Sequence, residues 1–415
     1  MKTRRRRRRR ITAKFVIILV LFIIALTLGI LVLSNSGSDN DNVVPGETQK
    51  PGLIDSIFSK TPEPTETPEP EPTETPEPTP TPLPEFSPYA IEGTRPSDFG
   101  METAIEVNGE IVSSYQREQT IDFGEGRDYT QLEGIITFRG NNFRDNPAYG
   151  TATIVEKTLD DANAWIVNTG SVPKVYGSGA WTGSGWTGQP LIVRWPEETK
   201  RIMNLYDSAK NKTDLVEVIY ATMDGHIYFL DLDTGERTRD PINMGRYPFK
   251  GAGALDPRGY PLMYLGSGDD SKDDGEGSSH ASIISLIDGK VLYEFGSKDS
   301  FSLRGKLSYF DSSALVDAET DTLIYPGENG ILYMIKLNTN YDVNAGTISV
   351  APEVVKWRYK GSRNNSTATV DGSKGWWFGM EDSAIIWRGH LIVSDNGGHM
   401  MCINLNTLEL VWVQD

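Results

Sequence analysis

Short apolar segments separated by turns dominate the chain from about Gly134 to its end. Alternating or β-branched runs are typical of β-strands, and the runs found here are EVIYAT, HIYFLDL, ASIISLI, TLIYPG, ILYMIKL, HLIVSD and MMCINL. Turn pairs that suit tight hairpins separate them, such as Asp224-Gly225, Asp288-Gly289 and Asn329-Gly330. The pattern therefore predicts an all-β domain with few helices.

Two sequence elements recur at similar intervals. The first is a strand led by small residues, which can be aligned on Leu191, Leu255, Leu315 and Ile385. The second comes later in each unit, as LDLDTGE, SLIDGK, IKLNTN and INLNTLE. Three units close on a further strand (VLYEFG, VKWRYK and LVWVQD), and a weaker stretch near 236–242 closes the first. Four strands in a fixed order predict the blade of a β-propeller.

The repeat resembles that of propellers similar to the pyrroloquinoline-quinone (PQQ) dehydrogenases. Gly225 to Gly235 (GHIYFLDLDTG) matches best, and the stretches starting at Gly330 and Gly398 match less fully. Phe138 to Arg144 (FRGNNFR), followed by AWIVNTG, is similar to the lead-in of a first blade. The resemblance extends from about Ile135 to Asp415. It implies the fold but not the chemistry, because propellers carry many unrelated functions.

The quinone chemistry of that family is disfavoured. Such dehydrogenases carry a vicinal cysteine pair over the cofactor and a calcium site, whereas this chain has a single cysteine, Cys402. The apolar run around Cys402 indicates a buried side chain rather than a reactive thiol. Nucleotide-binding glycine motifs are also missing from the sequence. We therefore expect no cofactor.

The strand count bears on whether the ring closes. Trp165 to Thr169 (WIVNT) is similar to an outer strand placed before the first blade, yet the fourth unit already ends on its own outer strand, LVWVQD. This gives one strand too many for a closed ring of four. We expect about four blades in an open arc that belongs to a larger ring; in the alternative, WIVNT pairs elsewhere and the ring of four closes.

The first 33 residues have the pattern of a membrane anchor. Phe15 to Leu33 contains no charged residue and is long enough for a helix across a bilayer. Residues 1–14 carry seven consecutive arginines, and basic residues stay on the cytoplasmic side. We expect an uncleaved single-pass anchor with a cytoplasmic N-terminus and an extracytoplasmic propeller. A cleaved signal peptide is the alternative, although signal sequences have shorter apolar regions.

Residues 34–95 predict a disordered stalk, because they lack apolar periodicity and include a Thr-Pro-Glu repeat from Thr61 to Pro84. A lead-in segment (96–133) and the propeller (134–415) follow. The chain has a formal net charge of −17 although its first residues are strongly basic. The exported part is thus acidic, and we expect no nucleic acid partner.

Aromatic residues outside the repeats are the candidate ligand contacts. Aromatic faces beside arginine and asparagine can stack on sugars or peptide side chains. The candidate site residues are Trp181, Trp186, Arg194, Trp376, Trp377, Arg139 and Asn141. For the four tryptophans among them, packing and ligand contact remain open. Trp165, Trp357 and Trp412 lie at repeated positions and are expected to pack between sheets.

Metal binding and catalysis have weaker support. In the loop Ser267 to His280, Asp270, Asp274 and Gly275 approach the order of a calcium loop, but Lys272 stands at the middle ligand position. A solvated insertion is the favoured interpretation, and the four histidines lack zinc-ligand spacing.

We expect a binding or scaffolding module for a cell-wall polysaccharide or a surface protein. The alternative is a propeller enzyme that acts on an external saccharide.

Overall fold

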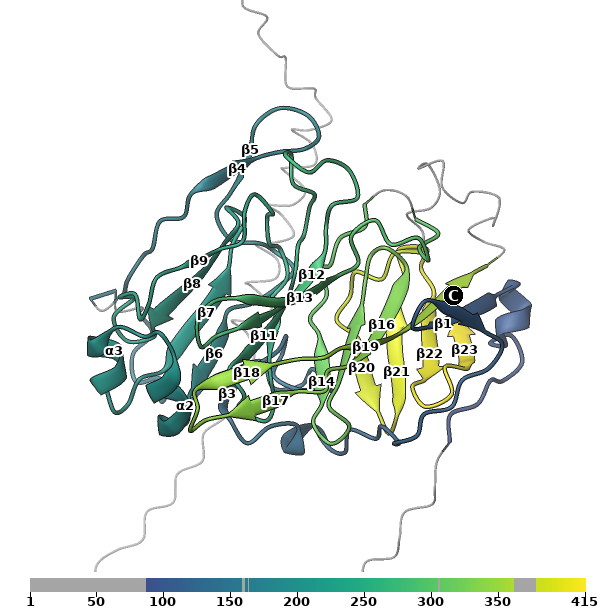
Figure 1. Ribbon diagram of the computed structural model, residues 1–415, viewed down its shortest axis with the longest axis horizontal. Coiled ribbons are helices and arrows are strands. Elements are labelled where there is room, and N and C mark those ends of the chain that lie inside the picture. Colours follow the sequence, from purple (N-terminus) through teal and green to yellow (C-terminus); the bar gives the residue numbers. More distant parts are fainter. Residues whose placement is uncertain (1–86, 159–160, 163, 305–306, 362–377) are drawn as a thin grey trace, which may run out of the picture. The chain divides into compact units, whose positions relative to one another are not determined.

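The computed structural model describes residues 87–158, 161–162, 164–304, 307–361 and 378–415. The predicted basic segment, the membrane anchor, most of the stalk, Trp376 and Trp377 lie outside these residues. Four of the six antiparallel sheets in the described part contain the blades, which come one after another along the chain (Figure 1). They are the blades of an all-β propeller, as the repeats predicted. None of the helices within the described ranges is long and apolar enough to cross a membrane.

Each blade is an antiparallel meander of four strands. Blade one contains β6 (Leu191–Arg194), β7 (Glu217–Ala221), β8 (His226–Asp231) and β9 (Ile242–Asn243). Blade two contains β10 (Ala254–Leu255), β11 (Leu262–Gly266), β12 (Ala281–Ser285) and β13 (Val291–Phe295). Blade three contains β14 (Leu315–Asp317), β15 (Thr322–Pro326), β16 (Ile331–Lys336) and β19 (Glu353–Lys360). Blade four contains β20 (Ile385–Trp387), β21 (His390–Ser394), β22 (Met400–Asn404) and β23 (Leu410–Gln414).

The remaining elements decorate these blades. From the lead-in, β1 (Glu102–Val107) and β2 (Glu110–Val112) extend the outer edge of blade three, and β3 (Glu133–Ile135) pairs with β6. Two hairpins stand apart from the blades, β4 (Ser171–Pro173) with β5 (Ala180–Thr182) and β17 (Asn340–Asp342) with β18 (Thr347–Ser349). The short helices are η1 (Pro96–Phe99), η2 (Gly126–Asp128), α2 (Glu197–Ile202) and α3 (Asp207–Asn211).

All seven predicted apolar runs form strands, and the predicted closing strands become β13, β19 and β23. The weak stretch in the first unit yields only the two-residue strand β9. Because side chains alternate between the faces of a strand, both faces of an inner blade must be apolar. This explains the nearly continuous burial of β11, β12 and β15.

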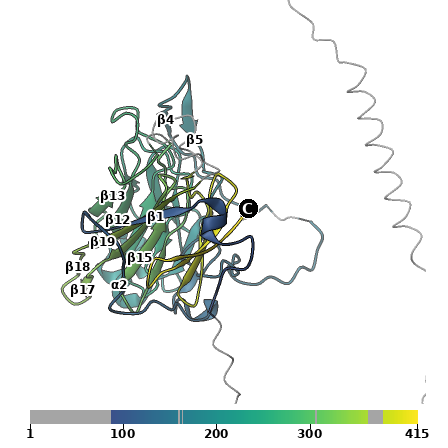
Figure 2. The ribbon, with the colours of Figure 1, turned by 90° about the vertical axis from the view of Figure 1, so that its right-hand side faces the viewer.

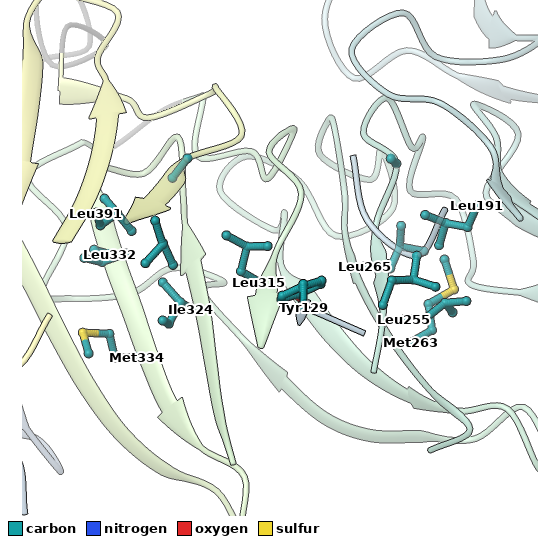
Figure 3. Packing of buried hydrophobic residues seen from close by; sticks show 14 of the residues in the cluster. Tyr129, Leu191, Leu255, Met263, Leu265, Leu315, Ile324, Leu332, Met334 and Leu391 are labelled. Atoms are coloured by element: carbon teal, nitrogen blue, oxygen red, sulfur yellow. The ribbon is translucent and has the colours of Figure 1, made fainter. Parts of the chain in front are cut away.

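Neighbouring blades pack through rows of paired side chains. Leu255, Met263 and Leu265 of blade two turn toward Leu191 of blade one, and Leu391 of blade four lies beside Leu332 of blade three (Figure 3). A separate cluster fills the space between blades two and three, where the ring of Phe295 lies 5.0 Å from that of Tyr333 and 6.1 Å from that of Tyr325. The blade cores therefore form a continuous series.

Two sequence expectations were wrong. The alignment placed Leu255 with Leu191 and Leu315, but Leu255 faces the preceding blade, and Ala254 faces the following one. A shift of one residue moves every side chain of a strand to the other face. Because this inner strand mixes small and apolar residues on both faces, the sequence alignment could not show its register. WIVNT is not a strand either. Trp165 instead packs on the outer face of blade one, where its indole donates to the carbonyl oxygen of Leu232 at 3.0 Å.

Small residues lead the inner strands because the chain is crowded there. A Cβ at Gly188 would lie 2.3 Å from the backbone nitrogen of Ala252, and one at Gly251 would lie 2.6 Å from the carbonyl oxygen of Asp311. Consecutive blades thus approach through backbone rather than side chains. Glycine is required by this close approach.

Residues 133–144, which are called the lead-in segment from here on, cross the inner strands of all four blades. The segment pairs with blade one through β3. An isolated bridge from Thr137 to Ala254 joins it to blade two. The Thr137 hydroxyl joins it to blade three, because it donates to the carbonyl oxygen of Ala314. Asn142 exchanges hydrogen bonds with Ile386 of blade four. One segment therefore satisfies inner-edge polar groups of every blade.

Arg144, the last residue of this segment, joins several blades. Its guanidinium is buried and donates to the carbonyl oxygens of Ser313 at 2.8 Å, Ala384 at 3.0 Å and Phe138 at 3.0 Å. The Ser313 hydroxyl in turn donates to the carbonyl oxygen of Gly253, and the Ser383 hydroxyl accepts from the Ser313 amide. Arg144 with these partners is called the axial hub below.

The end blades each keep one face without a neighbouring blade. Blades one and four lie at opposite ends of the row (Figure 1), and the view from the side shows the sheets one behind another (Figure 2). Within the described ranges, no strand pairing joins blade one to blade four. Their arrangement is that of the expected open arc.

Arg144→Met should destabilise the protein by about 3 kcal/mol, because it leaves buried carbonyl oxygens of two blades without a donor. Chemical denaturation measures the free energy of unfolding. Arg139→Met is the matched control, since Arg139 lies in the same segment but is exposed; its effect should stay within about 0.5 kcal/mol. Equal effects of the two substitutions would contradict the axial hub.

Candidate functional site

Charged and aromatic side chains gather at one end of the blades. In a four-stranded meander the connections alternate between ends, so the loop into strand one and the turn between strands two and three share an end. The β4–β5 hairpin projects from this end (Figures 1 and 2). Loops from blades one to four supply the residues described next, which we call the end cluster.

Two tryptophans from the loop before blade one form its aromatic part. The rings of Trp181 and Trp186 lie 5.9 Å apart with a 48° tilt. The Trp181 indole donates to the carboxylate of Asp269 at 2.7 Å, and the Lys174 ammonium lies 4.0 Å from the Trp181 ring centroid. Trp186 remains 65% exposed. Trp181 is thus fixed by its partners, while Trp186 presents a free aromatic face.

Lys250, from the loop before blade two, links the aromatic and acidic parts. Its ammonium lies 4.7 Å from the ring centroid of Tyr309, 5.5 Å from that of Trp186 and 3.4 Å from the carboxylate of Asp311. Its side chain and that of Asp311 are 11% and 6% exposed. Gly268 makes this approach possible, because a Cβ there would lie 2.6 Å from the Asp311 carboxylate.

The acidic loop of blade two differs from the solvated insertion that its composition suggested. Its tip is exposed at Lys272 and Asp273, but Asp269 and Asp270 are buried. The Asp270 carboxylate accepts from the amides of Gly277 and Ser279, so it organises its own loop. Asp274 instead accepts from the Tyr247 hydroxyl. No group of three possible metal ligands occurs in the described part of the chain.

A buried ion pair from blade three forms the other side of the end cluster. Arg304 donates to the Glu328 carboxylate at 2.6 Å and to the Glu328 carbonyl oxygen at 2.9 Å. A Cβ at Gly379, before blade four, would lie 1.8 Å from the Arg304 guanidinium, so glycine is needed there. Glu381 lies next to Glu328 and accepts from Asn396 at 2.8 Å.

Two carboxyl groups in the end cluster have raised pKa values. Burial raises the pKa of Asp311 to about 7 although Lys250 opposes the shift, and burial raises that of Glu328 to about 9 although Arg304 opposes it. Burial would also raise the pKa of Glu381, but hydrogen bonds with Glu328 and Asn396 lower it. Asp311 Oδ1 is buried and has no hydrogen-bond donor among the described residues.

The candidate residues from the sequence divide between several places. Trp181 and Trp186 lie together in the end cluster. Arg194 ends β6 and forms an exposed ion pair with Glu133 at 2.8 Å. Arg139 and Asn141 belong to the lead-in segment, where Asn141 accepts from the Phe143 amide and donates to Asp145. Trp376 and Trp377 lie outside the described residues.

Sequence reasoning missed the charged members of the end cluster, chiefly Lys250, Asp269, Arg304, Asp311 and Glu328. A faint signal exists, because Asp311 and Glu381 each stand at the same distance before an aligned inner strand. The other members come from loops of different length, and only the fold brings them together.

No family model and no curated protein matches the chain. Solved structures similar to it include BamB from Moraxella catarrhalis (15% identity, 57% of this chain, 56% of that one, TM-score 0.28). The quinohemoprotein alcohol dehydrogenase from Comamonas testosteroni (10% identity, 68% and 49% coverage, TM-score 0.36) and a europium-containing methanol dehydrogenase (12% identity, 68% and 58% coverage, TM-score 0.35) are also similar.

The chain spans about half the length of these solved structures. The fold assignment depends on the four blades themselves.

The raised pKa values predict a pH dependence of stability. Above the ordinary carboxyl pKa, the unfolded chain loses protons that Asp311 and Glu328 keep when folded. The folded state then binds more protons, so the free energy of unfolding falls as pH rises, up to about pH 7 through Asp311 and about pH 9 through Glu328. Glu328→Gln should flatten this fall in denaturation experiments from about pH 5.5 to about pH 8.5. The exposed control Glu409→Gln should leave it unchanged, and an unaltered slope in Glu328→Gln would be the contrary result.

Proposed function

We propose that this protein is a binding module whose end cluster takes a hydroxyl-rich cell-wall polysaccharide. The observation that carries the proposal is the pairing of Trp181 and Trp186 beside Lys250 and the buried Asp311. An exposed indole such as Trp186 can stack on the apolar face of a sugar ring, and charged groups held nearby can bond its hydroxyls.

The buried Oδ1 of Asp311, which has no donor among the described residues, supports this proposal. An unpaired buried acceptor costs free energy, and a ligand that supplies a hydroxyl or amide donor would recover it. Lys250 lies near both the Trp186 ring and the Asp311 carboxylate, so one sugar unit could stack on Trp186 and donate to Asp311 at the same time. A protein partner is the alternative occupant of the end cluster.

The cellular setting is part of the same proposal. A helix at Phe15 to Leu33 would anchor the chain in the lipid bilayer, with residues 1–14 in the cytoplasm. A stalk rich in proline and glutamate would then hold the propeller at a distance from the membrane on the outer side. A propeller placed in this way meets the wall polymer before any membrane lipid.

Thermal unfolding of the full chain with purified wall polysaccharides or with peptides tests the proposal. A polysaccharide should raise the melting temperature without release of product, and Trp186→Ala should weaken binding about tenfold because the stacking face is lost. Tyr206→Ala is the control, since Tyr206 is also exposed (39%) but lies at the start of α3.

Other outcomes would replace the proposal. A response to peptides alone would favour a protein partner. Turnover of a saccharide that disappears in Asp311→Asn would favour the enzyme. Equal polysaccharide binding by the parent chain and Trp186→Ala would show that the end cluster is not the site.

A further inference from the structure

Each blade presents one row of side chains to the blade before it and one to the blade after it. In blade three, the row Leu315, Ile324 and Met334 faces blade four. In blade four, the row that faces blade three contains Ile386, Leu391 and Ile403. The same division holds between blades one and two and between blades two and three. Three interfaces within the chain therefore share one architecture.

Among the described residues, no blade packs against the row on the other face of blade four. It contains Ile385, Ile392, Cys402 and Trp412, which pair across the four strands just as the buried rows do. Ile385 is 38% exposed. A hollow of about 350 Å³ lies over this face, between the sheet and Pro88 with Tyr89. The face has the composition of an interface and lacks a full cover.

Blade one has the complementary free face. Its row contains Ile192, Val218 and Leu230, with Tyr220 and Tyr228 beside it. The extended strap Trp165 to Thr169 covers part of it, makes no strand pairing, and leaves a hollow of about 520 Å³ against the sheet. Ile166 of the strap is 90% exposed. A packed core leaves few voids of this size, so the strap is an incomplete cover.

We propose that a second copy of this chain occupies both faces, with blade four of each copy packed on blade one of the other. The free row of blade four corresponds to the row that each earlier blade turns toward the blade after it, and the free row of blade one corresponds to the row that each later blade turns toward the blade before it. Together they would form the same interface that already recurs three times in the chain. Two such contacts, related by a twofold axis, close a ring of eight blades, which is within the range that propellers adopt. The strap is displaced from blade one when the second copy binds.

Light scattering of the full chain in detergent micelles tests this proposal. The chain should have twice the mass of one copy. Ile385→Asp places a charge in the contact and should raise the dimer dissociation constant about 100-fold. Val291→Asp is the matched control, because Val291 is similarly exposed (41%) but lies on β13 of blade two. It should remain dimeric and keep the parent melting profile. Ile385→Asp should melt like the parent chain diluted below its dissociation constant, which shows that the variant is folded.

Mixing two variants distinguishes this arrangement from other dimers. Tyr220→Asp disables the blade-one face, so it should also be monomeric. An equimolar mixture with Ile385→Asp should form a heterodimer, since one intact contact remains. A monomeric parent chain would overturn the proposal, as would dimers of Ile385→Asp held together by the membrane segment, or dimers of Tyr220→Asp formed through blade four alone.

Discussion

The arrangement of the blades depends on the hydrogen bonds that the guanidinium of Arg144 donates. The guanidinium is buried, and its charge is stabilised by carbonyl oxygens of blades three and four and of the lead-in segment. Burial lowers the pKa of Arg144 to about 10, so the group stays charged at neutral pH. A charge of this kind is tolerated only where every donor finds an acceptor. The positions of the inner strands are therefore fixed relative to one another.

The same constraint shapes the end cluster. Ser313 of the axial hub follows Asp311 by only two residues. Because Ser313 is held by Thr137 and Gly253, the backbone that carries Asp311 is fixed as well. Polar groups on a rigid backbone can stay desolvated until a ligand binds, whereas polar groups on a mobile backbone would rotate into the solvent. The fold thus positions the proposed site.

The sequence was sufficient for the parts of the fold that depend on local pattern. Alternation of apolar residues predicted the strands, and repetition predicted their grouping into blades. The pairing of β1 with β19 could not be predicted, because it joins residues far apart in the chain. In the sequence, Arg144 cannot be distinguished from an exposed arginine, and only the fold shows that it is buried. Glu328 and Asp311 likewise converge through loops whose conformation no short motif records.

Hydrogen exchange of backbone amides tests most directly whether the lead-in segment holds the blades together. The informative amides are those of Phe138, which donates to Ser313, Leu255, which donates to Ile136, and Ile386, which donates to Asn142. If the axial hub unites the blades, these amides should exchange only through global unfolding, at the same free energy as the central amides of β12 and β16. Exchange of all three through local opening, while β12 and β16 stay protected, would contradict this account.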